Sequence, residues 1–258
     1  MRVFLKNISK QLKQFSKSLD KKSILIDQPW ALIDEDFEMQ KLIFKKDGEL
    51  IMSKNGQVTT GNWEYLPTAN SLLLDRGEDK ILCQEEFIDE GVLILRLDGT
   101  DNKFFALANE NIVPDLQVDS YLEDLKREKF RIKSFALHNS QTLEVFKSNA
   151  INSAELYNDY GKKVLIDGES PQDGEYELKN SDKRVRIKEG QIKKLLTTYE
   201  YQTKDGLTIY VEQVYPGPNW YEKGDKVFKD PDKTKSADNG VYKLGLFKKI
   251  YVRDGRIV

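Results

Sequence analysis

Two stretches in the second half of the sequence carry the same motif, and this duplication constrains the fold more than any other feature. Residues 161–192 and 224–257 each run from Gly-x-Lys-Val through Gly-x-Tyr-x-Leu and an alternating strand to Gly-x-Ile. The Asp-Gly, Asn-Gly and Glu-Gly pairs within them are typical of tight hairpin turns, because Gly and Asn tolerate positive φ. We therefore predict a second antiparallel β domain over residues 151–258, built from two copies of one unit.

The sequence around these two units also reads as strands. Residues 196–202 and 207–214 flank a Lys-Asp-Gly turn and predict another hairpin. Alternation over residues 184–188 places apolar side chains on one face of its strand and Arg184, Arg186 and Lys188 on the other. Residues 130–150 are predicted to form the junction that precedes this domain and to carry two short strands, 131–137 and 142–146.

The first half of the chain predicts an antiparallel meander over residues 23–129, closed by a helix. Turn residues separate short apolar runs at near-regular spacing, with Asp47-Gly48 and Asn55-Gly56 as the strongest hairpin signals. Asp115 is a predicted cap for a helix that carries Val118, Tyr121, Leu122 and Leu125 on one face. The expected strands are 23–26, 30–33, 40–46, 49–54, 57–66, 71–75, 80–84, 92–97 and 103–107.

A family resemblance supports a barrel in this half. The segments Leu42-Ile-Phe-Lys-Lys-Asp-Gly-Glu49, Gly61-Asn-Trp-Glu-Tyr65 and Ser71-Leu-Leu-Leu-Asp75 resemble the lipocalin-like domains of small bacterial proteins, over roughly residues 28–110. Pleckstrin-homology-type barrels, which also end in a helix, fit the same series. The duplicated units resemble β-repeats of uncharacterised bacterial proteins. The resemblance implies an architecture and no particular ligand.

Residues 1–22 predict a basic amphipathic helix. Ile8, Leu12, Phe15 and Leu19 are spaced by three or four residues and so share one face. The lysines lie opposite that apolar stripe, at Lys6, Lys10, Lys13 and Lys17. Such a helix either packs on its own domain with a solvated lysine face, docks in the groove of a partner, or lies on an anionic membrane surface.

Two groups of aromatic residues are candidate binding residues. Trp30, Trp63 and Tyr65 fall in the predicted barrel, where they either fill the core or line a pocket for a small ligand. Tyr215, Trp220 and Tyr221 lie in a loop with two prolines and suit either a protein interface or local packing.

Composition excludes several classes of chemistry. The chain has 41 basic and 43 acidic residues among 258, so no net field draws it to nucleic acid. Its one cysteine, Cys83, and one histidine can form neither an internal disulfide nor a Cys/His zinc site. Neither glycine-rich phosphate-binding signature occurs. We therefore expect no cofactor, no metal, no nucleic-acid partner and no catalytic residues.

The location follows from two further features. No apolar run approaches the roughly 18 residues of a membrane-spanning helix, and the N-terminus lacks the apolar core of a signal peptide. We expect a soluble, cytoplasmic protein.

These observations predict a mainly β fold and a non-enzymatic function. The favoured hypothesis is a protein-binding or scaffolding protein, because repeated units enlarge a contact surface instead of assembling one active site. The alternatives are binding of a small, lipid-like ligand in the first barrel and peripheral membrane association through the N-terminal helix.

Overall fold

The chain is mainly β, as predicted, and it divides into two compact units, Met1–Lys129 and Phe130–Val258. The structure is a computed structural model that describes residues 1–16, 20–33, 40–77, 79–217, 221–245 and 248–258. None of the helices within these ranges combines the length and apolar character needed to cross a membrane.

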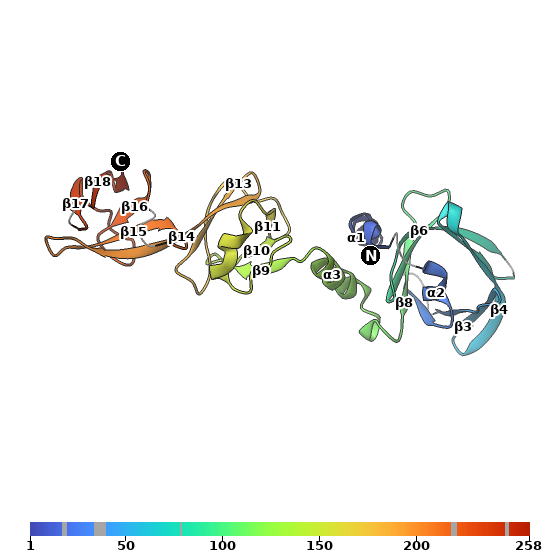
Figure 1. Ribbon diagram of the computed structural model, residues 1–258. Coiled ribbons are helices and arrows are strands. Elements are labelled where there is room, and N and C mark those ends of the chain that lie inside the picture. Colours follow the sequence, from blue (N-terminus) through green and yellow to red (C-terminus); the bar gives the residue numbers. More distant parts are fainter. Residues whose placement is uncertain (17–19, 34–39, 78, 218–220, 246–247) are drawn as a thin grey trace. The chain divides into compact units, whose positions relative to one another are not determined.

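The first unit contains a closed antiparallel barrel in which β8 pairs with β1 (Figure 1). Inward-facing side chains alternate along each strand and form one apolar core, which includes Trp30, Phe44 and Cys83. The Asn55–Gly56 hairpin signal is confirmed, since both residues have positive φ (50° and 79°) between two paired strands. The strands are β1 (Pro29–Ile33), β2 (Gln40–Phe44), β3 (Glu49–Lys54), β4 (Gln57–Leu66), β5 (Ser71–Asp75), β6 (Lys80–Ile88), β7 (Val92–Leu97) and β8 (Phe104–Asn109).

The predicted strand at residues 23–26 is wrong. Residues 23–25 belong to a second short helix, α2 (Lys21–Leu25), and Ile26 follows its last turn. Asp20 caps the helix by accepting a hydrogen bond from the backbone N–H of Ser23. The apolar run that suggested a strand instead packs into the barrel core through Leu25 and its neighbours. It covers the end of the barrel at which β2 finishes, where Ile26 bridges to Phe44.

The N-terminal helix, α1 (Arg2–Ser16), ends before the predicted Lys22, and residues 17–19 lie outside the described residues. Its buried face, with Leu5, Ile8 and Leu12, packs against β6, β8 and the closing helix α3 (Val118–Lys129). The predicted cap at Asp115 is wrong. This residue lies in a separate 3-10 turn, Pro114–Leu116, and α3 begins at Val118.

The second unit contains two antiparallel sheets (Figure 1). A three-stranded sheet has the order β11-β10-β9, and an eight-stranded sheet has the order β12-β13-β14-β15-β16-β19-β18-β17. The strands are β9 (Lys133–Ala136), β10 (Thr142–Val145), β11 (Val164–Ile166), β12 (Gly174–Glu177), β13 (Arg184–Lys188), β14 (Gln191–Gln202), β15 (Thr208–Val214), β16 (Lys226–Phe228), β17 (Gly240–Lys243), β18 (Lys249–Arg253) and β19 (Arg256–Ile257).

Two segments of this unit share one pairing scheme, and we name them module 1 (residues 133–192) and module 2 (residues 199–257). The two modules correspond strand by strand. In order, β9, β10, β11, β12, β13 and the start of β14 match the end of β14, β15, β16, β17, β18 and β19. Module 1 thus includes β9 and β10, which fall in the segment expected to be a junction. β14 runs continuously from one module into the other.

Equivalent backbone hydrogen bonds support this correspondence. The Gly161 N–H donates to Ile192 and the Gly224 N–H to Ile257, both at 2.8 Å. The last turn of each module also has an equivalent bond to a side-chain oxygen. The Glu189 N–H donates to Asp173 in module 1, and the Asp254 N–H donates to Asn239 in module 2. The same local sequence therefore produces the same turn chemistry twice.

Candidate functional sites

The aromatic candidates of the barrel fill its interior beneath α2. Trp30 is completely buried, and its indole N–H donates to the Leu25 carbonyl oxygen at 3.1 Å. Trp63 is 5% exposed, packs edge-to-face on Phe44 at 5.1 Å, and donates its indole N–H to the Lys45 carbonyl oxygen. These side chains serve as core at this end of the barrel.

Tyr65 belongs to a buried polar cluster that the sequence did not suggest. Its hydroxyl donates to Glu85 at 2.9 Å, and Lys21 of α2 forms an ion pair with the same carboxylate at 2.7 Å. Burial and the contact with Glu85 raise the pKa of Tyr65. Glu85 is 6% exposed, and these two partners supply the contacts that a buried carboxylate needs. The sequence held one indication that Glu85 is buried, namely that it alternates with Ile81 and Cys83 and so shares the inward face of β6.

A pocket of about 380 Å³ lies at the other end of the barrel, where β1, β5 and β7 finish and β6 and β8 begin. Four partly buried apolar side chains of the core line it, and Phe104 stands beside them. The remaining lining residues that the structure describes are basic, and none is acidic. The apolar four are Leu32, Ile81, Leu97 and Phe105, and the basic three are Arg2, Arg76 and Lys103.

The lysines of α1 lie partly against the barrel. Lys6 donates to the Asn102 side chain at 2.6 Å, and Lys13 pairs with Glu86 at 2.8 Å. Burial opposes ionisation of Glu86, but Lys13 and Arg96 outweigh it and lower its pKa. Lys10 is exposed, and Lys17 lies outside the described residues.

The aromatic loop contributes to packing inside the second unit. The rings of Tyr215 and Tyr157 meet edge-to-face with their centroids 5.9 Å apart. The Lys183 ammonium lies 4.6 Å from the centroid of the Tyr215 ring. Tyr221 contacts Tyr201, also at 5.9 Å. The third candidate, Trp220, lies outside the part of the chain that the structure describes.

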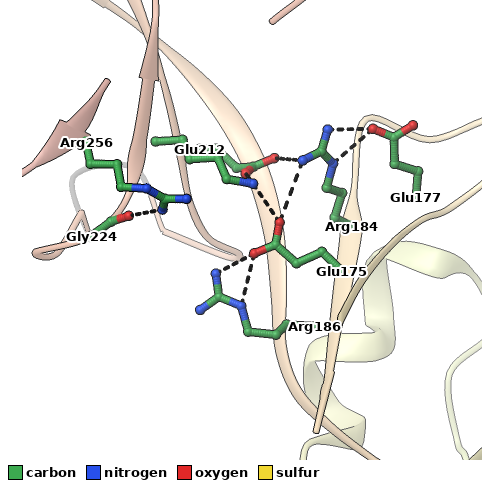
Figure 2. Close-up of polar contacts among 8 residues, drawn as sticks. Glu175, Glu177, Arg184, Arg186, Glu212, Gly224 and Arg256 are labelled. Carbon is green, nitrogen blue, oxygen red and sulfur yellow. Dashed lines mark hydrogen bonds and ion pairs between the residues drawn. The ribbon is translucent and has the colours of Figure 1, made fainter. Parts of the chain in front are cut away.

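A network of ion pairs joins the two modules (Figure 2). Glu175 of β12 accepts hydrogen bonds from Arg186 at 2.6 Å and from Lys226 of module 2 at 2.8 Å. Burial opposes ionisation of Glu175, but these two cations outweigh it and lower its pKa to about 2. Arg184 and Arg186 of the basic face predicted on β13 are therefore paired with carboxylates.

Arg184 extends this network across the module junction (Figure 2). It forms ion pairs with Glu177 at 2.5 Å and with Glu212 of module 2 at 3.4 Å. The Glu212 side chain is only 3% exposed, and Lys226 contacts it at 3.5 Å. Each charge in the network thus has an opposite partner.

The equivalent face of module 2 is different in character. Val241 and Tyr251 are directly opposite each other on β17 and β18, and they are 50% and 53% exposed. Val258 is 49% exposed and donates its N–H to the Tyr251 carbonyl oxygen. The face that carries ion pairs in module 1 therefore presents two exposed apolar side chains here, beside the exposed Lys243, Lys249 and Arg253.

Metal binding and catalysis receive no positive support from these sites. Within the described ranges, no group of three or more His, Cys, Asp or Glu side chains could hold a metal ion. Cys83 lies in the barrel core, where burial raises the pKa of its thiol to about 12. Such a thiol is unreactive near neutral pH.

Comparison with known proteins assigns no relationship. No protein family matches the chain, and no curated protein resembles it at a significant level.

Proposed function

We propose that this chain is a non-enzymatic binding protein whose barrel holds a small amphipathic anion at its open end. The observation that carries the proposal is the pocket of about 380 Å³, with apolar core side chains below and three basic residues among the lining residues that the structure describes. Its volume falls within the roughly 300–1,000 Å³ usual for small-ligand sites.

The lining determines which ligand chemistry fits. Burying an alkyl chain against Leu97 and Phe105 is favourable by roughly 25 cal/mol per Å² of apolar surface. A carboxylate at the rim would receive a charge-assisted hydrogen bond from Lys103, since Arg76 already pairs with Asp79. A single-chain fatty carboxylate combines both features and is the ligand class that we propose.

Isothermal titration calorimetry with dodecanoate tests this proposal. We expect binding that weakens about tenfold, or about 1.4 kcal/mol, in Lys103→Glu, because a rim cation is replaced by an anion. Lys46→Glu is the matched control, since Lys46 is an exposed lysine in the turn between β2 and β3, at the end that α2 covers. Absence of binding, or equal weakening by both variants, would overturn the proposal.

Protein binding by the second unit is a second candidate function, and the exposed pair Val241 and Tyr251 favours it. An apolar cross-strand pair left in water gains stability when another surface covers it. Membrane association through α1 has less support, because Leu5, Ile8 and Leu12 of its apolar face are buried within the first unit. Insertion of that helix into a bilayer would first expose the barrel surface beneath it.

A further inference from the structure

The pocket at the open end of the barrel is one layer of side chains deep. Its four apolar lining residues are the first inward-facing side chains from that end on β1, β6, β7 and β8. Inward-facing residues are two apart in a strand, so the next one on each strand lies roughly 7 Å further along it. These four next residues, which we name the floor, are Trp30, Cys83, Leu95 and Leu107.

The floor closes the interior beneath the pocket. All four of its side chains are 0% exposed. Three of them are directly opposite a lining residue of the pocket on a neighbouring strand, and side chains paired in this way are in contact. The floor is therefore continuous with the pocket wall, and the rest of the apolar core lies behind it. The opposed pairs are Leu107↔Leu32, Leu95↔Phe105 and Cys83↔Leu97.

A carboxylate bound at the rim fixes where the tail of the ligand begins. Lys103 immediately precedes β8 and lines the pocket, so a head group paired with it leaves the tail to enter between the apolar lining residues. An extended alkyl tail lengthens by about 1.3 Å per methylene, given C–C bonds of about 1.5 Å. The octanoate tail is then roughly 9 Å long and the dodecanoate tail roughly 14 Å. Octanoate therefore reaches the floor, whereas the dodecanoate tail exceeds the depth of the pocket.

We infer that the barrel selects fatty carboxylates by length, and that Cys83 sets the upper limit at about eight to ten carbons. Cys83 is the smallest of the floor residues, so the floor leaves the most room at its position opposite Leu97. Leu72, the other cross-strand neighbour of Cys83, is 1% exposed and belongs to the packed core. This inference rests on the proposed function, because it takes the pocket as the ligand site, and it adds which tail lengths fit that site.

Isothermal titration calorimetry of the full chain with straight-chain carboxylates from hexanoate to tetradecanoate tests the inference. While the tail lengthens within the apolar layer, each methylene should raise the affinity about fourfold, which corresponds to about 0.8 kcal/mol. We expect these steps to end by decanoate, so that dodecanoate and tetradecanoate bind within about twofold of each other. A tail that penetrated the core would instead gain about 16-fold between those two ligands.

Two substitutions of Cys83 should move this limit in opposite directions. Cys83→Leu adds bulk to the floor, so the affinity should stop rising about two methylenes earlier, and Cys83→Ala should let it rise for about one methylene more. Val92→Leu is the matched control, because Val92 is also 0% exposed but alternates with the inward-facing Leu93 and Leu95 and so points out of the barrel. It should leave the limit unchanged, and circular dichroism should show that each variant keeps the native fold.

The outcomes separate this inference from the proposed function. If none of the carboxylates binds, the proposed function falls and the length limit falls with it. If the affinity rises about fourfold per methylene through tetradecanoate, the barrel is a ligand site but the length limit is rejected. A limit that stays at the wild-type length in both Cys83→Leu and Cys83→Ala would reject Cys83 as the residue that sets it.

Discussion

Glu175 on β12 and Lys226 on β16 form an ion pair of 2.8 Å, although β13, β14 and β15 lie between their strands in the sheet. Neighbouring strands are about 4.8 Å apart, so a flat sheet would keep these side chains well separated. The sheet must therefore curl to bring β12 and β16 together. The charges that meet there connect module 1 to module 2 as well as the strands of one module.

This relationship predicts a pH-dependent loss of stability in Glu175→Gln. The folded protein lowers the pKa of Glu175 from its usual 4.5 to about 2, so the ionised form stabilises the fold above pH 4.5. This contribution is lost as the pH falls from 4.5 towards 2. At pH 7 we expect the variant to lose about 2 kcal/mol of unfolding free energy, measured by urea denaturation. The loss should shrink at pH 3.

Glu177→Gln is the control for this measurement. Glu177 also pairs with Arg184, but its side chain is 45% exposed, so solvent screens the interaction. Its loss should be clearly smaller than that of Glu175→Gln. Equal losses of unfolding free energy would contradict the prediction, because the ion pair between the modules would then stabilise the fold no more than the exposed pair does.

Asp225 offers a prediction of opposite sign. Burial raises its pKa from the usual 3.8 to about 6, although Lys194 and Arg186 act against this shift. Ionisation of Asp225 therefore destabilises the folded protein as the pH rises from 3.8 to 6. Asp225→Asn should raise the unfolding free energy at pH 7 by about 1–2 kcal/mol, and the difference should diminish near pH 4.

The measurement for Asp225 is again urea denaturation, with Asp232→Asn as an exposed control that should change little. The Asp225 carboxylate also accepts the Glu222 N–H at 2.8 Å. A variant that is less stable at pH 7 would show that this hydrogen bond outweighs the penalty of burial.

The local turns and strands could be predicted from the sequence because their signals are short-range. Asn55-Gly56 encodes positive φ by itself, and the alternation in residues 184–188 encodes one apolar face. The segment 23–26 could not be assigned in this way, because its three consecutive apolar residues, 24–26, fit a strand or one helical turn equally well. The decisive signal was the pair Asp20 and Ser23, which caps α2.

The pocket was not predicted, because its residues come from distant strands. Leu32, Ile81, Leu97 and Phe105 converge only when β1 closes the barrel against β8. Trp30 and Trp63 were selected for their size, and size is also what suits a side chain to filling a barrel core. The contacts between the modules likewise depend on sheet curvature, which the strand pattern does not specify.

Lys21 provides a final prediction, because it holds α2 over the filled end of the barrel through Glu85. Lys21→Met leaves a carboxylate that is 6% exposed without its cation, which should cost about 3 kcal/mol of unfolding free energy. Tyr65→Phe removes only a hydrogen bond to that group and should cost about 1 kcal/mol.

Urea denaturation followed by tryptophan fluorescence reports on this unit through the buried Trp30 and Trp63. Lys22→Met is the matched control, since its exposed ammonium lies 5.9 Å from the Trp63 ring centroid and should contribute less than about 1 kcal/mol. If Lys21→Met were no more harmful than Lys22→Met, Glu85 would have to be stabilised by Tyr65 and solvent alone, and α2 would be held by its apolar contacts.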